Sequence, residues 1–417
     1  MTADPFGTAS VIVSVAAVAA YMNHLTLRLP QTIALTLTGA LVSLLAAIAD
    51  RLWPAIGLAQ VVQAFMATID FRATLLNVML SFLLFAGALH VDLSGLRTGK
   101  WPILMLSTVG VVISTLVVGC GFWLLSAAFG AAAPFRWCLV FGALISPTDP
   151  VAVIAILQGS AAPKLLRTTV AAESLFNDGV GIVLFTVLLG MAAVGHAFSP
   201  LQGLEMFAVE ALGGLGLGLL LGLVGFLTIR SVEDYATEAL ITLALVMGGY
   251  SLAAALGFSG PVAMAAAGLI IGNVAMPKAM SAITQDHLTK FWDLLDQLLN
   301  AALFLLIGLQ GVALIGAPGL FVIGLITIPL VLLARMVSIA PALLIWRRLL
   351  PFCQAFPILA WGGLRGGICV AMALSLPHTP ARGAILVATY TVVMFSVLVQ
   401  GTSIEPLIRW MARRSKG

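Results

Sequence analysis

The feature that most constrains this chain is the recurrence of long apolar runs, each close to the length that a helix needs to cross a lipid bilayer. A bilayer offers no water to free backbone groups, so a spanning chain forms either α-helices or a closed β-barrel. A barrel would show segments of about ten residues with alternating hydrophobicity, whereas these runs are apolar throughout. Charged residues make up only 9% of the sequence, against about 25% in soluble domains. The sequence therefore predicts an all-α polytopic membrane protein.

Thirteen runs are long enough to span the membrane. They cover residues 8–27, 31–49, 73–91, 101–130, 135–158, 166–194, 203–229, 236–256, 260–276, 290–314, 318–346, 355–376 and 382–405. A further segment, 54–69, is short and carries Gln60 and Gln63, so we expect it to lie at the membrane interface or half-buried.

The distribution of Lys and Arg sets the expected orientation of these spans. Most basic residues fall in loops that share one face with the C-terminal tail, whereas the loops of the other face hold only Arg51, Arg72, Arg136 and Arg382. Because basic loops stay in the cytoplasm, the N-terminus is predicted outside and the C-terminus inside. The net charge of +4 forms no basic stripe, so no nucleic-acid partner is expected.

One predicted span carries a polar cluster at membrane depth, made of Glu173, Ser174, Asn177 and Asp178. Carboxylates there cost roughly 2.5–3.5 kcal/mol each on insertion scales, so they are rare and usually functional. Ser174 and Asp178 stand four residues apart and therefore share one helix face. Hard oxygens in such a place suit a small dehydrated cation or a proton. Because a carboxylate holds one or the other but not both comfortably, Asp178 is the strongest functional candidate.

Two arginines, Arg335 and Arg365, also fall within predicted spans. A lone buried charge costs several kcal/mol, so buried cations and anions in one apolar chain imply mutual pairing. We expect Glu173 to serve mainly as the buried partner of Arg335. Ser174 is either a cation ligand or a hydroxyl bonded to the preceding turn. Asn177 is expected to position its neighbours more than to bind the ion.

Two predicted spans look interrupted. Pro147 and Pro150 disfavour helix within the run 135–158, and four glycines between residues 362 and 367 weaken the run 355–376. With thirteen spans these two would run in opposite directions. Paired interruptions in corresponding halves are typical of inverted-repeat transporters, whose site lies near the bilayer midplane.

The ends of interrupted helices expose free amides, which attract an anion, and free carbonyls, which attract a cation. The carboxylate of Asp149 could therefore lie at the free amides, and the guanidinium of Arg365 could lie at the free carbonyls. Both residues could merely cap broken helices. Alternatively Asp149 is itself a cation ligand, and the carbonyl and hydroxyl of Thr148 are further candidate ligands.

The remaining reactive residues favour no enzymatic chemistry. The four cysteines, Cys120, Cys138, Cys353 and Cys369, lack metal-ligand spacing and are interpreted as small core residues. A zinc motif such as HExxH, or a histidine at membrane depth beside Asp178, is missing from the sequence. The protein is therefore not expected to be an enzyme.

Two further patterns leave alternatives open. Glu205, Glu210 and Glu238 lie toward span ends, where contact with lipid headgroups or a place in a cytoplasmic funnel is favoured over a binding role. The glycine-rich run 213–225 indicates either close helix packing or a flexible linker between repeats.

Four segments together resemble the signature segments of the monovalent cation:proton antiporters of the NhaP/NHE type. They are SPTDPVAV at 146–153, ESLFNDGVGIVLF at 173–185, ARMVSI at 334–339 and GGLRGGI at 362–368. The resemblance extends from the third predicted span to the last. It implies an NhaA/NhaP-like antiporter fold of inverted repeats with two unwound crossing helices.

The resemblance also implies roles for the site residues. Asp178 would be the essential ion- and proton-binding carboxylate, and Ser174 with the Thr148 carbonyl would complete the shell of a bound Na⁺. Asp149 would lie beside them in the unwound crossing. Asn177, which precedes Asp178, is the residue found in the electroneutral branch of the family.

Three further positions complete this comparison. Glu173 and Arg335 would form a buried ion bridge, and Arg365 would stabilise the second unwound helix. Some relatives carry an acidic residue in the third span that helps to bind the ion, whereas this chain has Ala86 there. The site then has one carboxylate fewer, which leaves the shell, the affinity and the choice between Na⁺ and K⁺ open.

The function implied by the resemblance is electroneutral Na⁺(Li⁺)/H⁺ antiport in the bacterial inner membrane, with no cofactor besides the transported ions. The implied architecture is a homodimer in contact with lipid, in which a core (73–194 and 318–405) moves like an elevator against an interface bundle (8–49 and 203–314). A K⁺/H⁺ antiporter on the same scaffold stays open as the alternative. A Na⁺-coupled symporter of organic anions is more distant.

Overall fold

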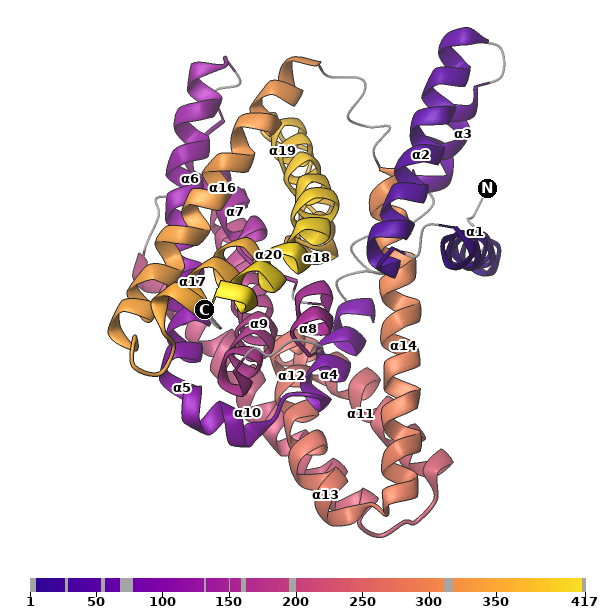
Figure 1. Ribbon diagram of the computed structural model, residues 1–417, viewed down its shortest axis with the longest axis vertical. Coiled ribbons are helices and arrows are strands. Elements are labelled where there is room, and N and C mark those ends of the chain that lie inside the picture. Colours follow the sequence, from indigo (N-terminus) through magenta and orange to yellow (C-terminus); the bar gives the residue numbers. More distant parts are fainter. Residues whose placement is uncertain are drawn as a thin grey trace.

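A computed structural model describes residues 5–26, 29–53, 57–67, 78–130, 133–149, 151–158, 163–194, 200–310 and 318–414 of the chain. These residues are almost entirely helical (Figure 1). The strand-like pairing among them is an isolated antiparallel bridge between Asp149 and Leu364. The all-α fold class is therefore confirmed.

The elements follow one another along the chain with short connections. The N-terminal part contains α1 (Pro5–Leu25), α2 (Gln31–Leu52), α3 (Leu58–Ala67), α4 (Leu80–Leu89), α5 (Leu93–Ser107), α6 (Val109–Ala128), α7 (Phe135–Ile145), α8 (Val151–Gln158) and α9 (Lys164–Val194). The middle part contains α10 (Pro200–Ile229), α11 (Tyr235–Ala255), α12 (Gly260–Ile270), the π-helix η2 (Ile271–Ala275), α13 (Met276–Ala279) and α14 (Ala282–Leu309). The C-terminal part contains α16 (Pro318–Ile345), α17 (Phe352–Trp361), α18 (Gly367–Leu374), α19 (Arg382–Phe395), the π-helix η3 (Ser396–Gln400) and α20 (Gly401–Arg414).

In the described part of the chain, ten helices are long and apolar enough to cross a membrane. Three shorter apolar helices, α4, α7 and α17, fall in the remaining runs that the sequence predicted as spans. Two of those runs are split, into α7 and α8 and into α17 and α18, and residues 73–77 of the third lie outside the described residues. The predicted number of thirteen spans is therefore not confirmed.

Three of the described helices begin with a polar cap, and one of them begins well before its predicted apolar run. Ser281 caps α14 by accepting a hydrogen bond from the amide of Thr284 (3.3 Å), so the helix begins eight residues before the predicted run 290–314. Residues 311–314 of that run lie outside the described residues. Asp234 and Ser259 cap α11 and α12 in the same way. Segment 54–69, expected at the interface, contains the ten-residue helix α3.

Glycines allow several helix pairs to approach closely. A Cβ on Gly218 of α10 would overlap the Ala263 carbonyl of α12, and a Cβ on Gly308 of α14 would overlap the Thr36 carbonyl of α2. The helix α10 runs without interruption through the glycine-rich segment 213–225. That segment therefore serves close packing, and the alternative of a flexible linker is wrong.

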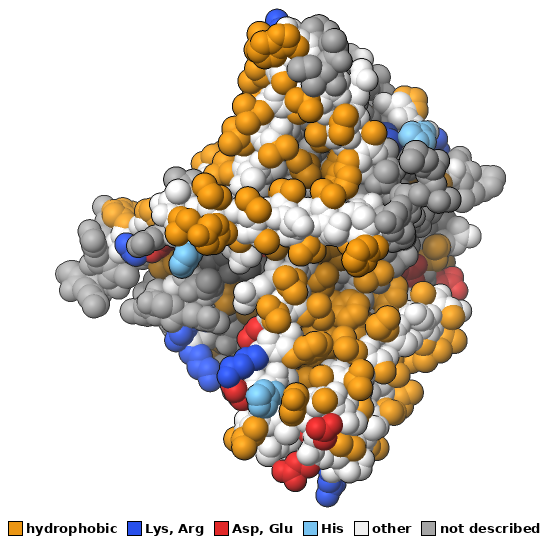
Figure 2. Space-filling model, turned by 90° about the vertical axis from the view of Figure 1, so that its right-hand side faces the viewer, with side chains coloured by type: hydrophobic (Ala, Val, Ile, Leu, Met, Phe, Trp, Pro, Cys, Tyr) orange, Lys and Arg blue, Asp and Glu red, His pale blue; other side chains and the backbone are white. Residues whose placement is uncertain are grey.

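The outer surface of the bundle is apolar over large areas, as a lipid-facing surface must be. Figure 2 shows one such face, where charged side chains gather toward the lower end of the molecule. On α10 the exposed side chains include Leu212, Leu220 and Leu227, with more than half of each accessible. A contiguous apolar surface of this kind marks contact with a membrane in a chain that has spanning helices.

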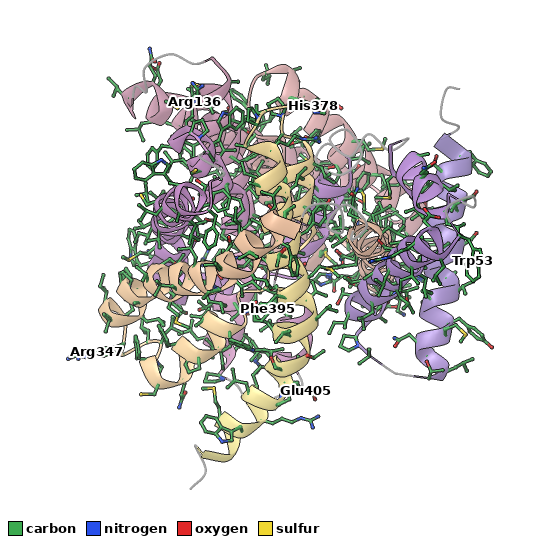
Figure 3. All side chains as sticks on the ribbon, turned by 90° about the horizontal axis from the view of Figure 1, so that it is seen from above. Trp53, Arg136, Arg347, His378, Phe395 and Glu405 are labelled. Atoms are coloured by element: carbon green, nitrogen blue, oxygen red, sulfur yellow. The ribbon has the colours of Figure 1, made fainter. Side chains whose placement is uncertain are left out.

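The helices form groups that pack side by side. The helix α14 packs along α2, and α10 packs along α12, while α16 packs against α19 and α6. Seen from above, α1 to α3 stand at one side of the molecule, where Trp53 lies, and Phe395 lies near the middle (Figure 3). The helix α4, which falls in the predicted core 73–194, packs mainly on α12 of the predicted interface bundle. The division into core and interface remains a prediction.

Candidate functional site

Two interrupted helices cross in the interior. The helix α7 ends at Ile145 and α8 begins at Val151, and α17 ends at Trp361 while α18 begins at Gly367. The connecting segments meet where the amide of Asp149 donates a hydrogen bond to the carbonyl of Leu364 (2.8 Å). The structure thus contains the two unwound crossing helices that the proline and glycine patterns predict.

Opposite charges lie at the ends of these half-helices. The Nη1 of Arg365 donates to the carbonyl oxygens of Ser146 (3.1 Å) and Pro147 (3.2 Å), at the C-terminal end of α7. The Asp149 carboxylate lies against Gly366, the N-cap residue of α18, and a Cβ there would overlap it. The positive guanidinium thus lies at the partly negative C-terminal end of α7, and the negative carboxylate lies at the partly positive N-terminal end of α18. Each of the two residues belongs to the other interrupted helix.

A buried ion pair joins three helices beside the crossing. The Nη1 and Nη2 of Arg335 donate to Oε1 (2.8 Å) and Oε2 (3.1 Å) of Glu173, and its Nε donates to the Leu359 carbonyl (3.0 Å). The exposed fractions of Arg335 and Glu173 are 6% and 2%. A bidentate pair in such a site compensates both charges and holds α16, α9 and α17 in one arrangement.

Asn177 connects this ion pair to the unwound segment. Its Nδ2 donates to Oε1 of Glu173 (2.8 Å) and to Oγ1 of Thr148 (2.7 Å), and its Oδ1 accepts from the Thr148 amide (3.3 Å). The hydroxyl of Ser174 donates to the Thr148 carbonyl. The Ser174 hydroxyl and the Thr148 carbonyl thus lie together, and Asn177 bonds the hydroxyl and the amide of the same threonine.

Asp178 lies one turn beyond Ser174 on α9, with only 7% of the residue exposed. Its carboxylate makes no hydrogen bond or ion pair with another residue that the structure describes. The charges of Asp149, Glu173 and Arg365 lie near enough to act on it electrostatically. A buried carboxylate in this state requires a proton or a cation as its partner.

Counting the charges of the site shows what it lacks. Glu173 is matched by Arg335, whereas the guanidinium of Arg365 lies near two carboxylates, bonded at the crossing beside Asp149 and acting electrostatically on Asp178. When all five groups are ionised, two carboxylates, Asp149 and Asp178, share one guanidinium, and the site carries one net negative charge. One proton or one monovalent cation therefore neutralises the site.

Two polar residues that support the crossing were missed by the sequence analysis. The hydroxyl of Ser396 accepts a hydrogen bond from the amide of Arg365 (2.7 Å), and the Nε2 of Gln400 donates to the Trp361 carbonyl (2.9 Å). Both belong to η3, and both are buried. Their signal is a polar residue inside the apolar run 382–405, the same signal that identified the cluster on α9.

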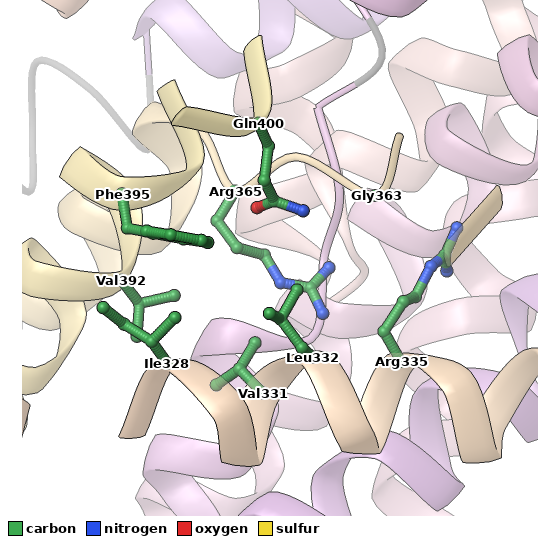
Figure 4. A pocket seen from close by; sticks show the side chains of 9 residues that line it. All are labelled: Ile328, Val331, Leu332, Arg335, Gly363, Arg365, Val392, Phe395 and Gln400. Atoms are coloured by element: carbon green, nitrogen blue, oxygen red, sulfur yellow. The ribbon is translucent and has the colours of Figure 1, made fainter. Parts of the chain in front are cut away.

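A small cavity of about 10 Å³ adjoins these residues (Figure 4). Arg365 and Gln400 line it together with apolar side chains of α16 and α19, and Arg335 lies farther along α16. The Nε of Arg365 is buried and has no hydrogen-bond partner among the described residues. A cavity of this size has room for about one water molecule, which would satisfy such a donor.

At the position where some relatives carry an acidic residue, Ala86 is buried, with 2% exposed. It lies in a hydrophobic cluster with Phe85 and Trp292. No charged group occupies this part of α4 in the described residues, so α4 adds none to the candidate cation ligands Asp178, Ser174, Thr148 and Asp149.

Known proteins resemble this chain in sequence and in fold. The family described as "Sodium/hydrogen exchanger, transmembrane" matches residues 12–410. The chain is 45% identical to the Na(+)/H(+) antiporter NhaP of Pseudomonas aeruginosa over 399 residues, which cover 93% of each protein. It is 34% identical to the Na(+)/H(+) antiporter NhaH of Halobacillus aidingensis, over 81% of this chain and 83% of that protein.

Among solved structures, the sodium proton antiporter MjNhaP1 of Methanocaldococcus jannaschii at pH 8 has a similar fold. The TM-score is 0.79 and the match covers 98% of both chains, with 21% sequence identity. The arrangement of the helices is therefore shared over almost the entire length.

Proposed function

Because the chain belongs to the transmembrane sodium/hydrogen exchanger family, we propose that it is an electroneutral Na⁺/H⁺ antiporter that also accepts Li⁺. The observation that carries this proposal is the buried carboxylate of Asp178, in a site whose five charged groups sum to one negative charge. The relatives named above are Na(+)/H(+) antiporters, that is, transporters and not enzymes.

The charge count explains why exchange would be strict. With Asp178 ionised and empty, the site carries one net negative charge, which is costly at the hydrophobic layer of a membrane. With a proton or a Na⁺ bound, the site is neutral and can change sides. Each crossing then carries one proton or one cation, and a full cycle moves no net charge.

The same geometry supports a shell for the cation. The Ser174 hydroxyl and the Thr148 carbonyl are already in contact, one turn from Asp178. Rotation of the Ser174 hydroxyl hydrogen away from Thr148 would direct both oxygens at an ion held by the carboxylate. Asn177 would keep the Thr148 hydroxyl and amide fixed during this change.

Further parts of the proposal follow from the family. The interrupted helices would move with the core as an elevator against the interface bundle, in a homodimer that contacts lipid. The protein would lie in the bacterial inner membrane with its N-terminus outside and its C-terminus in the cytoplasm. It would need no resident cofactor.

The test is dissipation of a preset pH gradient in proteoliposomes by Na⁺, Li⁺ or K⁺, with K⁺ and valinomycin clamping the voltage in the Na⁺ and Li⁺ runs. Na⁺ and Li⁺ should collapse the gradient, and Asp178→Asn should abolish the response while the protein stays folded. Asp286→Asn, at an exposed ion pair on α14, serves as the matched control.

Two results would contradict the proposal. A response to K⁺ alone, measured without the clamp, would assign the protein as a K⁺/H⁺ antiporter. No response to any cation between pH 5 and pH 9 would exclude antiport and turn attention to Na⁺-coupled symport.

A further inference from the structure

A second polar feature lies apart from the crossing, in a cavity of about 270 Å³. One wall is formed by α9 and the C-terminal end of α18, through Ile182, Thr186 and Ser375. The other wall is formed by α10, α11 and the turn before α12, and includes Glu210 and Ser259. A space of roughly 10–15 Å³ is enough for one water molecule, so this cavity holds a cluster of them.

The inner end of the cavity approaches the candidate ion site. Ile182 lines the cavity and lies one helical turn beyond Asp178 on α9, about 6 Å along the helix axis. Between them, Gly179 packs against Val262 of α12, where a Cβ would lie 3.2 Å from the valine side chain. A residue that lines the cavity thus lies within about one helical turn of Asp178.

The other end of the cavity is bordered by chain segments that share one side of the membrane. The turn between α11 and α12, with Gly257 and Ser259, lines the cavity, and so does Ser375, which directly follows α18. In the predicted topology this is the outer side, opposite to the basic loops.

Glu210 is the only charged residue among those that line the cavity. It is half-buried on α10, and its carboxylate makes no hydrogen bond or ion pair with another residue of the described chain. The N-terminus of α12 also faces this region, but a helix end carries only about half a positive charge. Ser259 also accepts a hydrogen bond from one of its amides (3.4 Å). The full charge of Glu210 therefore makes the cavity attractive to cations.

We propose that this cavity is the outer vestibule of the transport path, and that Glu210 holds the hydrated monovalent cation there before it reaches Asp178. This proposal rests on the function proposed above. The cavity has room for a cation with its first shell of water, and Glu210 lies on a helix outside the interrupted pair. Glu210 acts on the local concentration of the ion and does not enter the shell at Asp178.

The first test compares Glu210→Gln with Glu205→Gln in proteoliposomes of uniform orientation. Glu205 lies five residues earlier on α10, is exposed and does not line the cavity. The apparent KM for Na⁺ supplied to the face near Gly257 should rise roughly tenfold at low ionic strength in Glu210→Gln, and this effect should shrink in high salt. The ratio of the KM values for the two faces should change, whereas Glu205→Gln should leave it as in the parent protein.

Equal KM values in Glu210→Gln and the parent protein, or an equal rise from both faces, would overturn the vestibule. Absence of exchange in the parent protein would refute the proposed function instead. The two failures are therefore distinguishable.

A second test needs no transport. In a background without the exposed Cys120 and Cys353, Ser375→Cys places a thiol on the cavity wall. Its labelling rate with a cationic methanethiosulfonate, relative to an anionic one, should fall about tenfold when Glu210→Gln is added. An unchanged ratio would show that Glu210 does not set the charge of the cavity, and the proposal would fail.

Discussion

Replacing Arg335 by Met should destabilise the protein because it leaves the Glu173 carboxylate charged and unmatched in the interior. The substitution keeps an apolar stem and removes all three hydrogen bonds of the guanidinium, two to Glu173 and one to the Leu359 carbonyl. Breaking one side of a buried ion pair costs about 3–5 kcal/mol. We expect a loss of that size for Arg335→Met.

The loss converts into a shift of melting temperature. At about 2.1 cal/mol/K for each residue, a chain of 417 residues that unfolds cooperatively has an unfolding entropy of about 0.9 kcal/mol/K. A loss of about 3–5 kcal/mol then lowers the melting temperature by roughly 3–6 °C. The measurement is thermal unfolding of the purified protein in detergent, with the monodisperse fraction followed by size-exclusion chromatography.

A double-mutant cycle isolates the pair from the rest of the substitution. Glu173→Gln keeps an acceptor for Asn177 and removes the charge, so Glu173→Gln combined with Arg335→Met should be more stable than Arg335→Met alone. The coupling energy should be at least about 2 kcal/mol. Lys290→Met, which breaks an exposed pair with Asp286, is the control and should cost less than about 1 kcal/mol. A coupling energy near zero would refute the reasoning, because the two charges would then not depend on each other.

Three further predictions test other parts of the structure. Asn177→Ala removes the side chain that holds Thr148. Because one or two hydrogen bonds are lost, the apparent KM for Na⁺ should rise about tenfold. An unchanged KM in the proteoliposome assay would count against a positioning role. Gly218→Ala should lower the free energy of unfolding by about 1–3 kcal/mol, because the added Cβ meets the Ala263 carbonyl. Gly216→Ala, with open space around it, should instead raise it by about 0.5–1 kcal/mol. If the melting curves of the two variants shift in the same direction, the described packing of α10 is contradicted. The hydroxyl and the amide of Thr237 donate hydrogen bonds to the Asp234 carboxylate and lower its pKa below 3.8. The stabilisation from the ionised Asp234 is therefore fully present above pH 3.8 and is lost as the pH falls through the lowered pKa. Asp234→Asn keeps a cap that does not titrate, and its melting temperature should therefore fall less on acidification than that of the parent protein.

The sequence was informative wherever a residue conflicts with its surroundings. Placing a carboxylate in an apolar spanning segment costs free energy whatever its neighbours in the fold are. Asp178 and Glu173 could therefore be recognised as unusual from the sequence alone. Prolines and clustered glycines interrupt a helix for local reasons, so both unwound segments were predicted as well. These inferences need only the chemistry of one residue and its neighbours along the chain.

The sequence was less informative about helix ends and short helices. The prediction missed the first eight residues of α14, because these turns are polar and an apolar pattern contains no information about a helix cap. The glycine-rich run of α10 fitted two interpretations until the neighbouring helix was known. Ser396 and Gln400 were overlooked because a lone hydroxyl or amide in an apolar run bonds most often to its own helix.

The sequence by itself determined that this chain lies in a membrane and that two of its helices are broken, and it singled out one carboxylate on α9 as the candidate ion-binding group. Only the tertiary structure decided which charges neutralise one another. Arg365 reaches the carbonyls of Ser146 and Pro147, more than two hundred residues away, and Arg335 reaches Glu173 across a separation of 162 residues. Pairing of buried charges depends on distances of a few ångström between segments remote in the chain, and local patterns do not contain those distances. Among the five charged groups at the crossing, this pairing leaves one net negative charge, which an ion or a proton can match.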